Sequence, residues 1–229
     1  MLDVLREEKK YKISLKSKGY VLGYISNILH GDAFNGTRPY LVRSLYFDSI
    51  GDEDYFNKQV GTDYHKKIRL RVYSPDSDNA KLEIKEKSGS MQRKRSLTVS
   101  KEDAIELINR NYEVLKNYKE DLAEELYMIM VTKLYVPRCI VEYERIAFGT
   151  PENNIRITFD SNVRSNEGNF NLFSNELNTY PVMNSDDVIF EVKYNNFLFS
   201  YIKDVIRCID KIEVSASKYC MSRRFGLEG

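Results

Sequence analysis

The segment KKIRLRVY, residues 66–73, alternates polar and apolar side chains with a period of two. Successive side chains of a β-strand point to opposite faces, so Lys67, Arg69 and Arg71 project from one face and three aliphatic side chains from the other. Three like charges on one face of a strand repel one another unless an anion neutralises them. The segment therefore predicts a β-sheet that buries one face and binds an anion with the other.

Other segments repeat this arrangement. The cationic phase includes Lys85 and Lys87 in KLEIKEK (81–87), Lys94 in RKRSLTVS (93–100), Arg156 in IRITFDS (155–161), and Lys193 beside Glu191 in VIFEVKY (188–194). The simplest alternative is an antiparallel sheet with its polar face in water, but such a face usually mixes charges of both signs. Here the acids gather instead on the predicted helices between residues 101 and 132. The segregation favours a basic face that binds a polyanion.

The order of the remaining elements predicts an α+β fold. Strand patterns occupy residues 8–15, 41–49, 64–74, 81–89, 93–100, 138–148, 155–161 and 188–194, and helical patterns occupy 17–29, two stretches between 101 and 132 that break near Asn111, and 197–209. Turn-forming residues separate the strands, which favours antiparallel neighbours. If helices cover the apolar phase and the sheet closes on itself, the basic phase lines the lumen of a barrel. With no linker or repeat, we expect one domain over residues 1–229.

Composition limits the class of protein. The 229 residues are 42% hydrophobic and 30% charged, which is typical of a globular domain. The net charge of +1 argues against a general nucleic-acid-binding protein, which usually carries a marked basic excess. No apolar run is long enough for a signal peptide or a membrane span, and the three cysteines form no CxxC pair, so we expect a cytoplasmic protein with reduced thiols.

Two carboxylates share the cationic phase of the predicted strands. Glu8 and Glu191 are poor contacts for phosphate but good ligands for Mg²⁺ or Mn²⁺. These ions prefer oxygen donors and are often held by one or two carboxylates together with substrate phosphates. The combination of cations and acids predicts a divalent metal beside a phosphate chain.

The order of these pieces resembles a known family. The matching segments are REEKKY (6–11), RSLYFDS (43–49), KIRLRVY (67–73), LEIKEK (82–87), RKRS (93–96), YERIAF (143–148), IRITFD (155–160), FEVKY (190–194) and SASKY (215–219). Together they resemble the catalytic domain of the vacuolar transporter chaperone (VTC) polyphosphate polymerases, in the triphosphate tunnel metalloenzyme superfamily, and in particular its shorter bacterial stand-alone form. Arg6 stands where the wider superfamily has the first glutamate of a Glu-x-Glu-x-Lys motif, which favours the polymerase branch.

The resemblance implies a closed tunnel of eight antiparallel strands with helices packed outside. It also implies transfer of the terminal phosphoryl group of a nucleoside triphosphate, with ATP expected, to a growing polyphosphate chain. We expect Lys10, Arg69, Arg71, Lys85 and Lys218 to act in catalysis, and Lys94, Arg145, Arg156, Lys193 and Ser217 to bind substrate. The resemblance implies Glu191 as the ligand of Mn²⁺ or Mg²⁺, and we expect Glu8, on the same phase, to join it. This chemistry depends on positioning and charge stabilisation, so no nucleophilic cysteine or histidine is needed.

Three other functions remain open from the sequence. Water could replace the acceptor chain, which gives a triphosphatase or polyphosphatase. The basic face could bind polyphosphate without catalysis. An RNA-binding barrel would need exposed aromatic residues, and the low net charge makes it the weakest of the three. The sequence gives neither the oligomeric state nor a membrane partner that would receive the polymer.

Overall fold

A computed structural model of the chain describes residues 6–35, 38–89 and 91–227. These residues form two compact units. Unit 1 combines Met1–Leu41, Tyr143–Val163 and Met183–Ser217, and unit 2 combines Val42–Glu142, Arg164–Val182 and Lys218–Gly229. Two long strands, β7 (Tyr135–Thr150) and β8 (Ile155–Asn166), contribute residues to both units.

Unit 1 has the strand order β11-β1-β10-β8-β7. Its other strands are β1 (Arg6–Ser14), β10 (Asp187–Asn195), β11 (Lys211–Glu213) and the two-residue β2 (His30–Gly31), which pairs with β7. β1 is antiparallel to β10 and β11, and β10 is antiparallel to β8. The register pairs Glu8 with Lys193 and Lys10 with Glu191, so the charged side chains of these two strands share one face.

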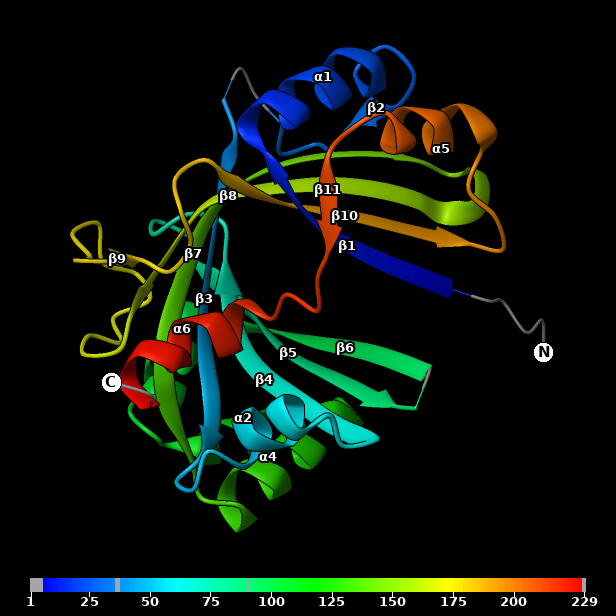
Figure 1. The fold of residues 1–229 in the computed structure, drawn as a ribbon. Helices are drawn as coiled ribbons and strands as arrows, with labels where there is room; N and C mark the ends of the chain where they lie inside the picture. Colours follow the sequence, from blue (N-terminus) through cyan, green and yellow to red (C-terminus); the bar gives the residue numbers. More distant parts are fainter. Residues whose placement is uncertain (1–5, 36–37, 90, 228–229) are drawn as a thin grey trace. The chain divides into compact units, whose positions relative to one another are not determined.

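Helices α1 (Leu15–Ile25) and α5 (Ser200–Arg207) cover the apolar face of unit 1 (Figure 1). Val21 and Ile25 of α1 and Ile202 and Val205 of α5 join strand residues such as Phe190 in one buried cluster. Helix α1 begins directly after β1 because the Ser14 side chain caps it, accepting a hydrogen bond from the Ser17 backbone nitrogen at 3.1 Å. The charged face of the strands is thus left on the side opposite the helices.

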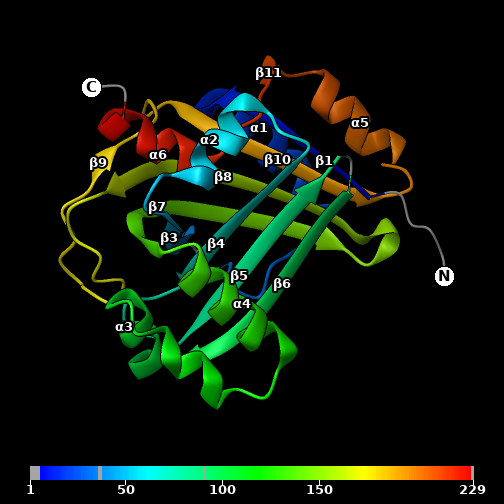
Figure 2. The same ribbon diagram turned by 90° about the horizontal axis from the view of Figure 1, so that it is seen from below.

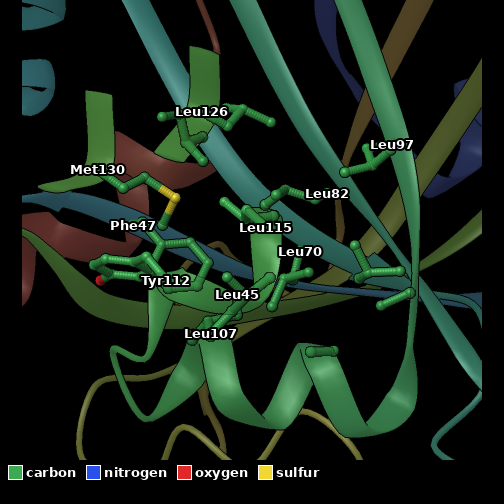
Figure 3. Close-up of a cluster of buried hydrophobic side chains, with 14 of the residues drawn as sticks. Leu45, Phe47, Leu70, Leu82, Leu97, Leu107, Tyr112, Leu115, Leu126 and Met130 are labelled. Atoms are coloured by element: carbon green, nitrogen blue, oxygen red, sulfur yellow. The ribbon is translucent and has the colours of Figure 1, made fainter. Parts of the chain in front are cut away.

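Unit 2 has the strand order β7-β3-β4-β5-β6. Its strands are β3 (Tyr40–Ser49), β4 (Tyr64–Val72), β5 (Asn79–Ser88), β6 (Met91–Ser100) and the two-residue β9 (Tyr180–Pro181), which pairs with β8. The apolar face is covered by α3 (Lys101–Ile108), the 3-10 helix η1 (Tyr112–Asn117) and α4 (Asp121–Thr132), as Figure 2 shows. Figure 3 shows how Leu45, Leu70 and Leu82 of the strands meet Leu107, Leu115 and Leu126 of these helices.

The structure confirms the α+β class and the antiparallel pairing that the alternation predicted. It also confirms the interruption near Asn111, where η1 separates α3 from α4. The full strand order begins at β11 and ends at β6, and it is open among residues 6–35, 38–89 and 91–227. The predicted closed eight-stranded barrel is therefore not confirmed and stays a prediction, as does a single domain.

Two helices were not predicted from the sequence. Helix α2 (Glu53–Val60) lies between β3 and β4, and α6 (Lys218–Leu227) follows the segment after β11. Within the described part of the chain, no helix has the length and apolar character that a membrane span requires.

Candidate functional site

In unit 2, the polar faces of β4, β5 and β6 align in four rows, because both strand pairs keep one antiparallel register. In order along β4 the rows are His65, Lys87 and Gln92; Lys67, Lys85 and Lys94; Arg69, Glu83 and Ser96; and Arg71, Lys81 and Thr98. Glu83 is the one acid among these twelve side chains, and seven are lysine or arginine. The structure therefore brings together the predicted residues Arg69, Arg71, Lys85 and Lys94.

Three of these cations surround Glu83, and we call Glu83, Arg69, Arg71 and Lys94 the Glu83 group. Glu83 Oε2 lies 2.8 Å from Arg69 Nε, 2.7 Å from Arg69 Nη2 and 3.7 Å from Arg71 Nη1, while Lys94 Nζ pairs with Oε1. Burial alone would raise the pKa of Glu83, which is 1% exposed, but the three cations outweigh it and lower the pKa to about 2. One carboxylate against three cations leaves an excess of positive charge that suits a phosphate chain.

Aromatic residues connect this group to α6. Arg69 Nη1 donates to the Tyr46 hydroxyl at 3.0 Å, and its guanidinium lies over the Tyr46 ring. Tyr46 stacks on Tyr219 of α6 with ring centroids 5.2 Å apart. The Tyr219 hydroxyl donates to the buried carboxylate of Asp48 at 2.6 Å. These contacts fix the start of α6, where the predicted residue Lys218 is the first residue of the helix.

In unit 1, two carboxylates and two ammonium groups form what we call the Glu8–Glu191 cluster. Lys10 Nζ lies 2.8 Å from Glu8 and 3.8 Å from Glu191, and Lys193 Nζ lies 3.2 Å from Glu191 and 3.8 Å from Glu8. The alternating charges come from the register, which sets a lysine opposite each glutamate. Each of the two predicted lysines thus contacts both predicted carboxylates.

The two predicted arginines of unit 1 contact acids. Arg145 makes a bidentate pair with the fully buried Asp160, at 2.6 Å and 2.7 Å. Arg156 pairs with Asp32, whose pKa is lowered because the Arg156 charge and hydrogen bond outweigh burial. The Arg156 side chain is 44% exposed and the Arg145 side chain is 13% exposed, so Arg156 is the more accessible of the two.

The carboxylates of unit 1 suit a divalent metal. Glu8 and Glu191 project from the same face of neighbouring strands, and β8 places Thr158 opposite Glu191. Thr158 is 2% exposed, and its Oγ1 has no hydrogen-bond partner in the described part of the chain. No cluster of three or more His, Cys, Asp or Glu suitable for a metal occurs among the described residues. The candidate donors are two carboxylates and this hydroxyl. Mg²⁺ and Mn²⁺ accept such a set when substrate phosphates complete it.

Several residues of these clusters were not selected from the sequence. Three of them lie on the polar phase of their strands: Glu83, Asp160 and Thr158. The sequence pattern did not single them out, because each stands among cations or apolar residues. The sequence does carry a signal for Glu83. It lies two residues before Lys85, so both side chains share one face, in a strand whose polar phase is otherwise dominated by lysine. The last predicted residue, Ser217, lies between β11 and α6 and belongs to unit 1, whereas Lys218 belongs to unit 2.

An antiparallel α+β fold that concentrates cations around a few carboxylates on its strands is typical of a protein that binds polyanions. Comparison with known families identifies the chain further. The sequence model of the VTC domain matches residues 5–225, so the chain belongs to the VTC domain family. This confirms the resemblance found in the sequence. Membership indicates a function related to triphosphate or polyphosphate, in a family of tunnel enzymes that generally use divalent metals.

The chain is also similar to solved structures. The chain is similar to a "putative adenylate cyclase" from Bacillus halodurans, with a TM-score of 0.52 and 11% identity over 93% of this chain and 96% of that chain. It is also similar to the PH1819 protein from Pyrococcus horikoshii, with a TM-score of 0.44 and 11% identity over 93% of this chain and 96% of that chain. No curated protein matches the sequence. At this identity, the first likeness establishes a shared fold.

Proposed function

We propose that this protein is a metal-dependent polyphosphate polymerase. It transfers the terminal phosphoryl group of a nucleoside triphosphate, with ATP the expected donor, to the end of a polyphosphate chain. The observation that carries the proposal is the Glu83 group: a buried carboxylate that holds Arg69, Arg71 and Lys94 on one face of a chain that belongs to the VTC domain family.

The Glu83 group supports this proposal because its guanidinium groups are preorganised. Arg69 is fixed by Glu83 and by the Tyr46 hydroxyl, so little side-chain entropy is lost when phosphate binds. Arginine presents a planar fork to phosphate oxygens, and Lys85 and Lys94 add point charges from the neighbouring strands. This face binds the triphosphate and stabilises the charge that spreads over the transferred group.

The reaction requires no covalent intermediate with the protein. A terminal oxygen of the acceptor chain forms a bond to the γ-phosphorus, and the bond from that phosphorus to the oxygen bridging to the β-phosphate breaks, so the nucleoside diphosphate leaves. We assign phosphate contacts in unit 1 to Lys10, Lys193, Arg156 and Ser217, and separately in unit 2 to Lys218. Arg145 is assigned a phosphate contact as well, with Asp160 fixing its guanidinium.

Glu191 and Glu8 would hold a divalent ion, which would neutralise part of the phosphate charge. In this structure Lys10 and Lys193 contact both carboxylates. With the carboxylates holding the ion, Lys10 and Lys193 would be the groups that contact phosphate. Glu191 is the more deeply buried of the two acids and is the main expected ligand.

The test is incubation of the purified protein with ATP and Mn²⁺, with ADP, inorganic phosphate and polymer measured together. The variants are Glu191→Gln and Arg69→Ala, and the matched control is Glu213→Gln, an exposed acid of unit 1. Loss of one charged hydrogen bond costs about 1.5–3 kcal/mol, so Arg69→Ala should lower kcat/KM by roughly tenfold to a hundredfold. Glu191→Gln should remove metal-dependent turnover, and Glu213→Gln should keep it.

The products separate the alternatives. Polymer formed together with ADP, lost in Glu191→Gln, lowered in Arg69→Ala and kept in the control, supports the polymerase. Phosphate release without polymer would show a triphosphatase or polyphosphatase. Triphosphate binding without turnover in the presence of Mn²⁺ or Mg²⁺ would show a non-catalytic receptor.

A further inference from the structure

The cationic face of unit 2 continues beyond the Glu83 group toward the beginning of β4. His65 lies on the same face as Lys67 and Arg69, in a row with Lys87 of β5 and Gln92 of β6. Arg69 lies four positions after His65, which is about 13 Å along a strand. The row of Lys67, Lys85 and Lys94 lies between them, so a basic path leads from the Glu83 group to His65.

The tautomer of His65 follows from its hydrogen bond. Nδ1 lies 3.2 Å from the backbone oxygen of Thr62. A carbonyl oxygen only accepts, so Nδ1 carries the proton of the neutral ring, and Nε2 holds a lone pair. When the ring gains a proton, Nε2 becomes a donor that a phosphate oxygen can accept.

The charges around the ring oppose that protonation. Three ammonium groups act on the ring, those of Lys58 of α2, Lys67 of β4 and Lys87 of β5, and its Nδ1 contacts the neutral carbonyl of Thr62. Burial and then these three ammonium groups lower the pKa of His65 below its ordinary value. An anion that neutralises the lysines would raise the pKa of His65 and so favour the protonated ring.

We propose that His65, Lys58 and Lys87 form a second subsite, which binds phosphoryl groups of a polyphosphate chain beyond those held at the Glu83 group, and that His65 takes up a proton from solvent when the chain binds. This inference rests on the proposed function. It states which part of the polyphosphate chain binds to the residues around His65. The proton adds to Nε2, and the resulting N–H donates to a phosphate oxygen.

The sign of the pH dependence follows. Chain binding raises the pKa of His65, so the protonated ring stabilises the complex below that raised value. The contribution is lost as pH rises through the pKa of the complex, and proton uptake is confined to the window between the pKa of the unliganded protein and that of the complex. Affinity for a long chain therefore falls as pH rises through the ordinary imidazole range near about 6.5.

The test is calorimetric titration of the whole chain with inorganic tripolyphosphate and with a long polyphosphate, each in two buffers of different ionisation enthalpy. The wild-type protein should take up as much as about one proton per long chain and none with tripolyphosphate. His65→Gln should abolish the uptake and weaken long-chain binding by about tenfold at acidic pH, while tripolyphosphate binding stays unchanged. His30→Gln, which changes the other histidine of the chain, is the matched control and should retain the uptake.

A second variant tests the proposal even if His65→Gln fails to fold. Lys87→Gln removes one of the opposing charges, so the His65 ring should already be more protonated before the chain binds, and proton uptake should shrink. Long-chain binding without proton uptake, or unchanged by His65→Gln, would overturn the subsite. Equal affinity for both polyanions would also overturn it and leave the proposed function intact. If the wild-type protein bound neither polyanion, the proposed function itself would fail.

Discussion

Glu83 shows how a single buried carboxylate can organise a basic site. Its charge is compensated by Arg69, Arg71 and Lys94, and these three cations would repel one another without it. We predict that Glu83→Gln lowers the free energy of unfolding by about 3–5 kcal/mol, the cost of leaving buried charge uncompensated. Chemical denaturation measures this loss, and Glu124→Gln on the exposed side of α4 should change stability by no more than about 0.5 kcal/mol.

The same carboxylate should make the stability of the protein depend on pH in the acid range. The three cations lower the pKa of Glu83 in the folded protein to about 2, below the ordinary value of 4.5. A carboxyl with a lowered folded pKa contributes stability that is present above the ordinary value and is lost as pH falls from 4.5 toward 2. The acid limb of the stability profile should therefore flatten in Glu83→Gln relative to Glu124→Gln. An unchanged acid limb would contradict the compensating role.

Thr158 allows a separate test of the metal site. Its buried hydroxyl has no partner in the described residues, so the nearly isosteric Thr158→Val should leave stability unchanged or raise it by about 1 kcal/mol. If the hydroxyl completes the donor set beside Glu191, the variant should need more Mn²⁺ for half-maximal turnover. Melting temperature and metal titration check the two effects, and Thr98→Val on β6 is the control. An unchanged metal requirement would remove Thr158 from the site.

At the scale of elements, Tyr219 is one of the residues that anchor α6. Asp48 accepts the Tyr219 hydroxyl and also the backbone N–H groups of Ser49, Asp54 and Tyr55. We predict that Tyr219→Phe lowers the free energy of unfolding by about 1.5–3 kcal/mol, as expected for a hydrogen bond to a charged group. Because α6 begins at Lys218, polymerase activity should fall as well.

Hydrogen exchange of the α6 backbone checks this anchor directly. Tyr219→Phe should speed exchange in α6, whereas Tyr201→Phe, on the exposed surface of α5, should not. If α6 stays protected while activity falls, the hydroxyl acts on the substrate rather than on the helix.

The elements that the sequence predicted well are those with one buried face. β4 and β10 alternate cleanly because apolar residues such as Ile68 and Phe190 pack under helices. Helices α2 and α6 were missed for a different reason. The buried side chains of α2 include Asp54, and α6 is held by Tyr219 and by Arg223, which pairs with Asp52, so polar contacts rather than an apolar stripe fix these helices.

The sequence predicted the cations of the candidate site but not the carboxylates that neutralise them. Alternation assigns Arg69 and Lys94 to one face, yet it does not give the register that brings Lys94 within reach of Glu83 on the neighbouring strand. The same holds for Arg145 and Asp160, which are 15 residues apart and meet on adjacent strands. Pairing across strands depends on turn geometry and packing, which one sequence does not encode locally.

At the scale of the whole molecule, a net charge of +1 hides a strong segregation of charge. The four rows of unit 2 carry seven cations and one acid, while α3 and α4 carry acids in their first turns. Positive charge is thus concentrated on the strands of unit 2, and negative charge on the helices α3 and α4. A protein of this kind can bind a polyanion strongly without the overall basic charge that attracts nucleic acid.

This segregation predicts how the molecule responds to ligand and salt. Tripolyphosphate that binds the folded state should raise the melting temperature, with a gain in the free energy of unfolding of about 2.7 kcal/mol at a hundredfold excess over Kd. Screening shortens from about 10 Å at 0.1 M salt to about 3 Å at 1 M, so the rise should shrink as salt is added. Thermal unfolding measures both effects. Arg69→Ala should lose most of the rise, while Lys119→Ala, an exposed cation near α4, should keep it. An equal rise in both variants would mean that tripolyphosphate binds through diffuse charge, and the Glu83 group would no longer be the site.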